Sequence, residues 1–117
     1  MTSLAAGAFA AALAVVCGAF GAHALAGIGE QRLGFWTTAA HYHFIAAFGM
    51  IAEGLRARGA WSLGSPTSAF ALAILLFSGS LYAMALGAPR WFGAITPCGG
   101  VSLIVGFVWL GLRALQH

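Results

Sequence analysis

The chain has 117 residues, of which 62% are hydrophobic and only 6% are charged, and its formal net charge is +3. A water-soluble domain of this length needs far more charged side chains to keep its surface hydrated. The five basic residues are scattered instead of gathered into a run, so the composition also argues against a nucleic-acid-binding protein. We therefore expect lipid, not water, to surround most of the polypeptide.

Four long apolar segments account for most of the chain, at residues 4–26, 34–52, 68–86 and 91–112. Each is about twice as long as a strand of a membrane barrel and shows no polar–apolar alternation, which favours helices. A helix also satisfies its own backbone hydrogen bonds inside lipid. The connecting loops are short, so consecutive helices should be antiparallel neighbours. The predicted fold is an all-α integral membrane protein with one domain, residues 1–117, built as an antiparallel bundle of four transmembrane helices.

The first segment also resembles a secretory signal, because Ala22 and Ala24 flank His23 as small residues flank a cleavage site. It lacks the Lys or Arg that normally precedes the apolar run of a signal peptide. We therefore expect this segment to be retained as a span. His23 then lies near a loop at the membrane interface, and Cys17 is expected to pack as a small hydrophobic residue.

Polar side chains gather in the first half of the second segment, namely Thr37, Thr38, His41, Tyr42 and His43. At 1.5 Å per residue, His43 lies about 13 Å beyond the start of the segment, near the middle of the membrane. A polar group at this depth is costly unless it faces the bundle interior, a cavity or another polar group. His43 shares a helical stripe with Ala39, Ala46 and Met50, so it is expected to point inward and to form a hydrogen bond between helices, with a proton relay as the alternative. His41 points to nearly the opposite side, so the two histidines should not bind one metal ion.

The third segment contributes Ser78, Ser80 and Tyr82, and the fourth contains Thr96 and Pro97 near its start. Pro97 removes one backbone hydrogen bond and is soon followed by two glycines, so a kink is expected there. The alternative is a discontinuous helix whose freed carbonyl groups face a ligand or an ion. In an up-and-down bundle these residues lie towards the same side of the bilayer. The predicted polar cluster, in the outer half of the membrane, comprises His23, Tyr42, His43, Ser78, Ser80, Tyr82, Thr96 and Pro97.

Charged and aromatic residues predict how the bundle sits in the membrane. Glu53 and Arg56 are three residues apart and are expected to form a surface ion pair at a helix end. The side that holds both chain ends and the middle loop has three arginines and the other side has two: Arg56, Arg58 and Arg113 against Arg32 and Arg90. This excess predicts that both termini are cytoplasmic. All four tryptophans fall near predicted helix ends or in a loop and are expected to be interfacial anchors: Trp36, Trp61, Trp91 and Trp109.

Four motifs follow one another along the chain: GAFGAHAL at 18–25, W-x-x-A-x-x-Y at 36–42, FSGSLY at 77–82 and GAITPCGG at 93–100. Through them the sequence resembles the YgdD/YwdK-like family of small bacterial inner-membrane proteins, domain of unknown function number 423, which has a mitochondrial transmembrane-protein relative. The resemblance implies a multi-pass, four-helix protein of the bacterial cytoplasmic (inner) membrane and implies no activity. The family usually has a histidine four residues after the tyrosine of the second segment. This chain has Ala46 there, so a role of that histidine does not carry over directly.

The leading functional hypothesis is a structural or accessory protein that packs against a larger membrane complex or against itself. It rests on the short loops, on small-x-x-x-small spacings such as Gly18 with Ala22, and on the lack of paired acid–base or metal-ligand spacings. We expect the lipid bilayer and other membrane-protein subunits or a second copy as partners, and no enzymatic activity, metal or cofactor. One alternative is a bundle that binds or transports a small molecule or an ion at the polar cluster. The other is a membrane enzyme or cofactor carrier that uses its His and Tyr side chains.

Overall fold

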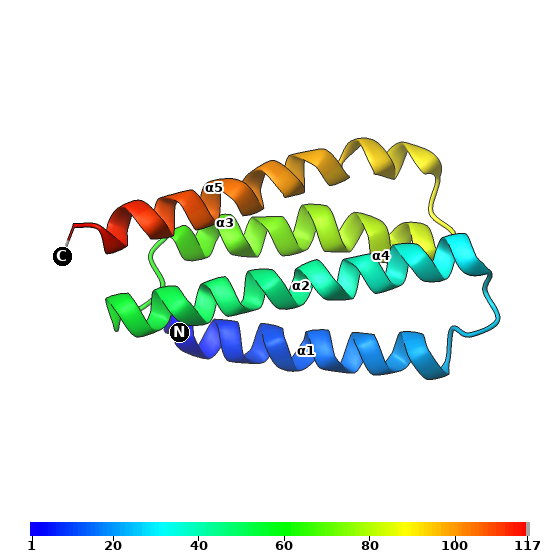
Figure 1. Cartoon of the computed structure of the whole chain (residues 1–117), viewed down its shortest axis with the longest axis horizontal. Coiled ribbons are helices and arrows are strands. Elements are labelled where there is room, and N and C mark those ends of the chain that lie inside the picture. Colours follow the sequence, from blue (N-terminus) through cyan, green and yellow to red (C-terminus); the bar gives the residue numbers. More distant parts are fainter. Residues whose placement is uncertain (117) are drawn as a thin grey trace.

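Four helical rods make up the computed structural model, which describes residues 1–116 (Figure 1). The first two rods are single helices, α1 (Ser3–His23) and α2 (Glu30–Ala57). The third rod joins α3 (Pro66–Ala73), the π-helix η1 (Ile74–Ser78) and α4 (Gly79–Ala85). The fourth joins the 3-10 helix η2 (Arg90–Ala94) to α5 (Thr96–Ala114). The predicted all-α class is confirmed for the described residues.

Three of the rods are long and apolar enough to cross a membrane, namely α1, Pro66–Ala85 and Arg90–Ala114. They correspond to the first, third and fourth predicted segments. The remaining rod, α2, is 28 residues long and extends beyond both ends of the predicted segment 34–52. Its first half carries Thr37, Thr38, His41 and His43, which lower its hydropathy, and it is not among the three candidate spans.

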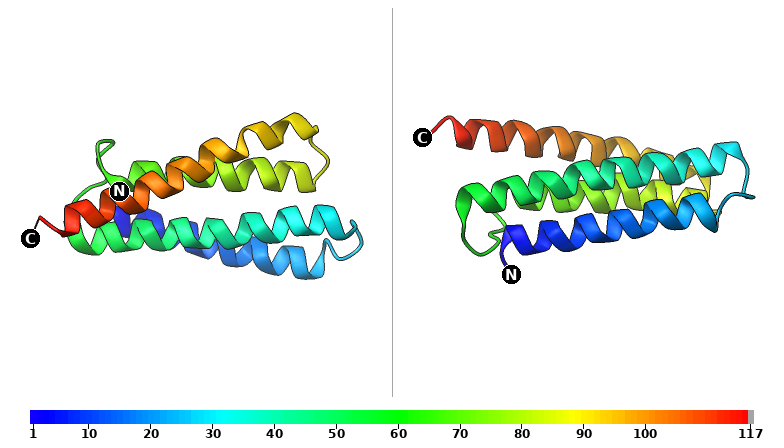
Figure 2. Two further views of the ribbon diagram at one scale, coloured as in Figure 1. Left: turned by 45° about the horizontal axis from the view of Figure 1, so that its top comes forward. Right: turned by 60° about the horizontal axis from the view of Figure 1, so that its bottom comes forward.

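The inner pair of rods consists of α2 and the third rod, and α1 and α5 flank them. α1 packs on α2, α5 packs on α3 and η1, and α2 also lies against α3, η1 and α4 (Figures 1 and 2). The molecule measures 49 × 26 × 20 Å, and consecutive rods run in opposite directions (Figure 1). Both chain ends and the loop between α2 and α3 therefore lie at one end of the bundle, which we call the terminal end. The loops after α1 and α4 lie at the other, which we call the loop end.

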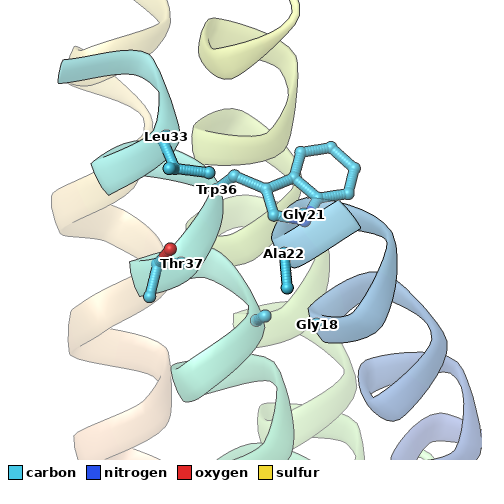
Figure 3. Close-up of a pocket in the computed structure, with 7 residues that line it drawn as sticks. Gly18, Gly21, Ala22, Leu33, Trp36 and Thr37 are labelled. Atoms are coloured by element: carbon cyan, nitrogen blue, oxygen red, sulfur yellow. The ribbon is translucent and has the colours of Figure 1, made fainter. Parts of the chain in front are cut away.

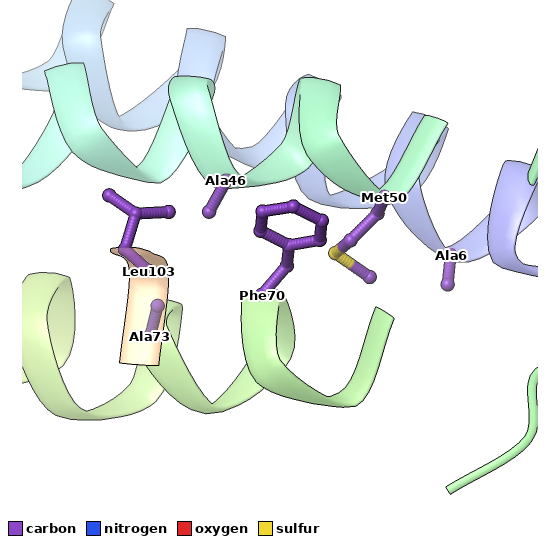
Figure 4. Packing of buried hydrophobic residues seen from close by; sticks show 6 residues of the cluster. All are labelled: Ala6, Ala46, Met50, Phe70, Ala73 and Leu103. Carbon is purple, nitrogen blue, oxygen red and sulfur yellow. The ribbon is translucent and has the colours of Figure 1, made fainter. Parts of the chain in front are cut away.

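The apolar core of the terminal half surrounds Phe70, whose ring is fully buried between α2 and α5 (Figure 4). A Cβ atom at Gly49 would lie 2.5 Å from Cζ of this ring, and one at Gly106 would lie 2.8 Å from its Cε1. Two glycines therefore let both helices close on the two sides of one phenylalanine. The other members of this core are Ala6, Ala46, Met50, Ala73 and Leu103.

The third rod departs from the plain helix that the sequence predicts, and the fourth rod is irregular near Pro97. A π-helical turn at Ile74–Ser78 interrupts the third rod, and the main chain of Phe77 meets α5 at Gly99, where a side chain would have no room. In the fourth rod, Pro97 lies in the first turn of α5, where the missing N–H would be unpaired in any case. The irregularity predicted around Pro97 is a change of helix type: the 3-10 helix η2 ends at Ala94, and α5 begins at Thr96 beside the proline.

The outer faces of the flanking rods are covered by large apolar side chains. Examples from α1 and α5 are Phe9, Leu13, Val16, Val101, Ile104 and Val108, all exposed. A soluble monomer rarely exposes so continuous an apolar surface, whereas a surface that faces lipid tails must be apolar.

Candidate functional site

Buried polar side chains lie where the loop-end half of α2 meets the third rod. The His43 side chain is only 2% exposed, and its Nδ1 is 3.0 Å from the hydroxyl oxygen of Tyr82 on α4. The other ring nitrogen, Nε2, is buried and has no hydrogen-bond partner among the described residues. The ring faces the main chain of Ala10 on α1 without reaching hydrogen-bond geometry. A neutral imidazole that accepts from a tyrosine hydroxyl at Nδ1 carries its proton on Nε2, so this proton would face α1.

A second group of hydroxyls joins the third rod to its two neighbours. Ser78 donates to the carbonyl oxygen of Ala39 on α2 at 2.8 Å. Ser80 donates to the carbonyl oxygen of Phe77 at 2.9 Å, and the hydroxyl oxygens of Ser80 and Thr96 are 2.6 Å apart. Since the single hydroxyl proton of Ser80 is already committed to Phe77, Thr96 is the donor in this contact. These contacts tie α5 and α2 to the irregular part of the third rod.

Three members of the predicted cluster lie outside this buried layer. His23 is exposed in the last turn of α1, and Pro97 is exposed at the start of α5. Tyr42 is 38% exposed and packs edge-on against Phe77, with ring centroids 4.8 Å apart. The cluster is thus divided into the His43–Tyr82 pair, the serine and threonine contacts, and these three outer residues.

Trp36 is a central residue of the site, and the prediction that it is an interfacial anchor is wrong. The Trp36 side chain is buried, and its indole Nε1–H donates to the carbonyl oxygen of Cys17 at 2.7 Å. Its ring lies against Gly21 of α1 and 4.5 Å, centroid to centroid, from the ring of Tyr82. Trp36 therefore positions the tyrosine that contacts His43. Its spacing of seven residues from His43, two helical turns on the same face, was the signal that could have revealed this.

The ion pair between Glu53 and Arg56 is confirmed, but it is not the surface pair that the sequence predicts. The guanidinium Nε and Nη2 atoms of Arg56 donate to the two carboxylate oxygens of Glu53 at 2.8 and 2.9 Å. Glu53 is only 1% exposed, whereas the Arg56 side chain is 20% exposed. Hydrogen bonding to the carboxylate raises the pKa of Arg56, so the arginine stays charged beside a buried anion.

Two cavities are prominent, and no member of the predicted cluster lines either of them. One, about 230 Å³, lies between α1 and α2 in the loop-end half (Figure 3) and is lined by Gly18, Gly21, Ala22, Leu33, Trp36, Thr37 and Ala40. The other, about 340 Å³, lies at the terminal end and is lined by Thr2, Leu4, Gly54, Leu55 and Arg58. Within residues 1–116, no three His, Cys, Asp or Glu side chains gather as a metal-ion site would require. The geometry of the buried layer is suited first of all to holding helices together.

Apolar helices long enough to cross a membrane, joined by short loops and by inward polar contacts, define a small all-helical membrane protein. The chain belongs to the family described as "Protein of unknown function (DUF423)", whose model matches residues 17–100. This result confirms the resemblance inferred from the sequence motifs.

Relatives match over nearly the whole chain. The chain is 40% identical to the "UPF0382 membrane protein YwdK" of Bacillus subtilis, over 95% of this chain and 94% of the relative. It is 36% identical to the "UPF0382 inner membrane protein YgdD" of Escherichia coli K12, over 87% of this chain and 80% of the relative. No solved structure matches the chain. These relatives are named as membrane proteins, and neither name states an activity.

Proposed function

We propose that this chain is a structural or accessory subunit of the bacterial inner membrane, with four spans and both termini in the cytoplasm. In this function it packs against another transmembrane helix, supplied by a larger membrane complex or by a second copy of the chain. The proposal assigns it no catalytic step and no cofactor. The observation that carries it is the cavity of about 230 Å³ between α1 and α2, a groove lined largely by small residues (Figure 3).

Several close helix contacts of this bundle use glycines, whereas Gly18 is a glycine that contacts no neighbouring helix. Added Cβ atoms at Gly7, Gly21 and Gly49 would clash with a neighbouring helix, whereas one at Gly18 would meet no atom within 4 Å. Gly18 and Ala22 are both exposed and lie one turn apart on the groove wall. In lipid, helices associate through close packing of small residues, because burial of apolar surface gives no net driving force there. A partner helix in this groove would find the same close approach that the internal glycines provide.

The inclusion of α2 among the spans is supported by its position. It packs against α1 on one side and against the third rod on the other, both of which are apolar enough to cross the membrane. Of its polar residues, His43 faces the bundle interior, so lipid does not contact it. Four antiparallel spans bring both termini to one side, and the three arginines expected at that end then favour the cytoplasm.

The test of the proposal is gentle purification of the full chain from native-level expression, followed by measurement of the mass of the particle. A persistent partner or oligomer is expected for the wild type. The substitution Gly18→Leu fills the groove and should remove most of that association. The control is Gly111→Leu on α5, at a glycine that is likewise exposed and free of contacts within 4 Å but lies outside the groove. A lone wild-type monomer, or equal behaviour of the two variants, would contradict the proposal.

A second candidate function, binding of a small hydrogen-bonding molecule or an ion, is favoured by one atom. The buried Nε2 of His43 has no hydrogen-bond partner among the described residues. Buried polar atoms in native structures usually have such a partner, which can be a bound water or solute. The test is nitrogen-15 NMR of the histidine rings with candidate solutes added and removed. A solute-dependent shift confined to His43 supports binding, and its absence with every solute removes this candidate.

A further inference from the structure

The cavity at the terminal end, between the start of α1 and the end of α2, has the polarity of a lipid-binding site. Thr2 and Leu4 form one wall, Leu55 and Arg58 form the other, and Gly54 lies between them. On α1 the polar residue is the outer one and the leucine is deeper. On α2 the same order holds, since Arg58 lies about 4.5 Å further along the helix axis than Leu55 at 1.5 Å per residue. Both walls thus change from polar to apolar in the direction that leads into the membrane.

The apolar part of this cavity is open to the surroundings. The Leu55 side chain is 61% exposed, and the Leu4 side chain is 41% exposed. In a bundle surrounded by lipid, these leucines meet acyl chains. An acyl chain that enters between them lies next to Gly54, where α1 approaches so closely that its main chain at Leu4 leaves no room for a Cβ atom.

The polar part of the cavity offers an uncompensated positive charge. The only ion pair among the described residues joins Arg56 to Glu53, so the guanidinium of Arg58 has no carboxylate partner there. Thr2 accepts a hydrogen bond from the backbone N–H of Ala5 at 3.0 Å, which leaves its hydroxyl proton free to donate. A phosphate oxygen between these two walls would receive a charge-assisted hydrogen bond from the arginine and a second from the threonine.

The two walls are held together by main-chain contacts, so the cavity is a fixed feature of the fold. The backbone N–H of Trp61 donates to the carbonyl oxygen of Met1 at 2.8 Å, and Thr2 pairs with Ala60 in an isolated antiparallel bridge. Arg58 itself ends α2 in the left-handed conformation, with φ 56°, and its N–H bonds to the carbonyl oxygen of Gly54 at 2.9 Å. This backbone geometry directs the chain from α2 back to the start of α1.

We propose that this cavity binds one anionic phospholipid, with its phosphate at Arg58 and Thr2 and one acyl chain between Leu4 and Leu55. The choice of an anionic over a zwitterionic lipid follows from the charge at this end of the bundle. Three arginines and one glutamate lie at this end, and that glutamate is already paired with one of the arginines. The site does not depend on which partner fills the α1–α2 groove in the other half of the molecule.

The experiment is native mass spectrometry of the full chain in mild detergent, with phosphatidylglycerol or phosphatidylcholine of identical acyl chains added. The wild type should retain one phosphatidylglycerol about fivefold more tightly than phosphatidylcholine, the preference expected for one basic side chain at an anionic surface. Arg58→Asn should abolish this preference, and asparagine is chosen because it tolerates the left-handed conformation. Arg58→Lys keeps the charge and should keep most of the preference.

Arg90→Asn is the control, since it removes an exposed arginine at the loop end of the bundle. It should leave lipid retention at this site unchanged, and circular dichroism checks that each variant remains helical. If Arg58→Asn alters the fold, Arg58→Gly replaces it, because glycine adopts this conformation without strain. Equal retention of the two lipids by the wild type, or an undiminished preference in the Arg58 variant, would overturn the proposal. Equally tight binding of free glycerol phosphate would overturn it as well, since that result leaves no role for the acyl chain.

Discussion

The two halves of the bundle are held together in different ways. In the terminal half, α2 and α5 close on the ring of Phe70 through Gly49 and Gly106, and this core contact is one of apolar packing. In the loop-end half, Trp36, Tyr82 and His43 connect α1, α2 and α4 through an indole–carbonyl bond and a hydroxyl–imidazole contact. Lipid tails are as apolar as leucine, so close packing and hydrogen bonds are the two means by which helices recognise each other in a membrane.

Both halves use both means, since Thr67 donates to Ser3 at 2.7 Å in the terminal half and Gly21 contacts Trp36 in the loop-end half. The comparison teaches that the two cores differ in which of the two means is central to them. Close packing is intolerant of change, because neighbouring helices cannot fill a hole or make room for extra atoms. A single hydrogen bond in a membrane bundle contributes less, about 0.6 kcal/mol on average. We therefore expect the terminal half to be the more sensitive to substitution and the loop-end half to be the more adaptable.

The largest effect is expected for Phe70→Ala. Removing a fully buried ring from between two glycines leaves a cavity that no neighbouring side chain can fill, and the expected loss is about 3–5 kcal/mol of unfolding free energy. The measurement is reversible unfolding in detergent, followed by circular dichroism. Phe48→Ala is the control, because Phe48 lies on α2 in the same half of the bundle and its side chain is 56% exposed. A similar loss in both variants would show that the Phe70 core has no special importance.

An intermediate effect is expected for Glu53→Gln, also in the terminal half. The change keeps the size of the side chain but leaves Arg56 without its anion, at a cost of about 1–3 kcal/mol. The loss should be smaller than for a fully buried pair, because the partly exposed arginine can turn towards water and lipid headgroups. Glu30→Gln, at an exposed acid in the first turn of α2, is the control for lost charge alone. Equal unfolding free energies for the two variants would mean that the buried ion pair is not stabilising.

The smallest of the three effects is expected for Tyr82→Phe in the loop-end half. It removes only the hydroxyl that contacts His43, and the expected loss is about 0.6–1.7 kcal/mol. In a His43→Leu background the same change should have almost no further effect, so a double-mutant cycle isolates the contact. A loss that exceeds that of Phe70→Ala would reverse the comparison between the two halves.

Much of the architecture was predictable from periodicity and composition. Long apolar segments indicated the rods, and the stripe of Ala39, His43, Ala46 and Met50 identified the buried face of α2. The Glu53–Arg56 pair followed from its helical spacing, although its burial did not, because sequence spacing gives neighbours on a helix and not what covers them.

The remaining features depend on contacts between rods, which no local pattern contains. Trp36 is buried because Gly21 of another helix opens room for its ring, and a tryptophan near a helix end is otherwise typical of the membrane interface. Tyr42 and His43 are adjacent in sequence and point about 100° apart on the helix. Only the packing of the neighbouring rods leaves His43 buried and Tyr42 38% exposed. The π-turn at Ile74–Ser78 and the start of α5 beside Pro97 are choices of helix type that propensities leave open.

The central claim, that α2 crosses the membrane inside a four-span bundle, is tested most directly by cysteine accessibility in intact cells. In a background of Cys17→Ala and Cys98→Ala, the single changes Gly27→Cys and Gly59→Cys place a thiol in the exposed loop at either end of α2. We predict that a membrane-impermeant maleimide labels the thiol at position 27 in intact cells and the thiol at position 59 only after the cytoplasmic membrane is permeabilised. Labelling of both from the same side would contradict the account.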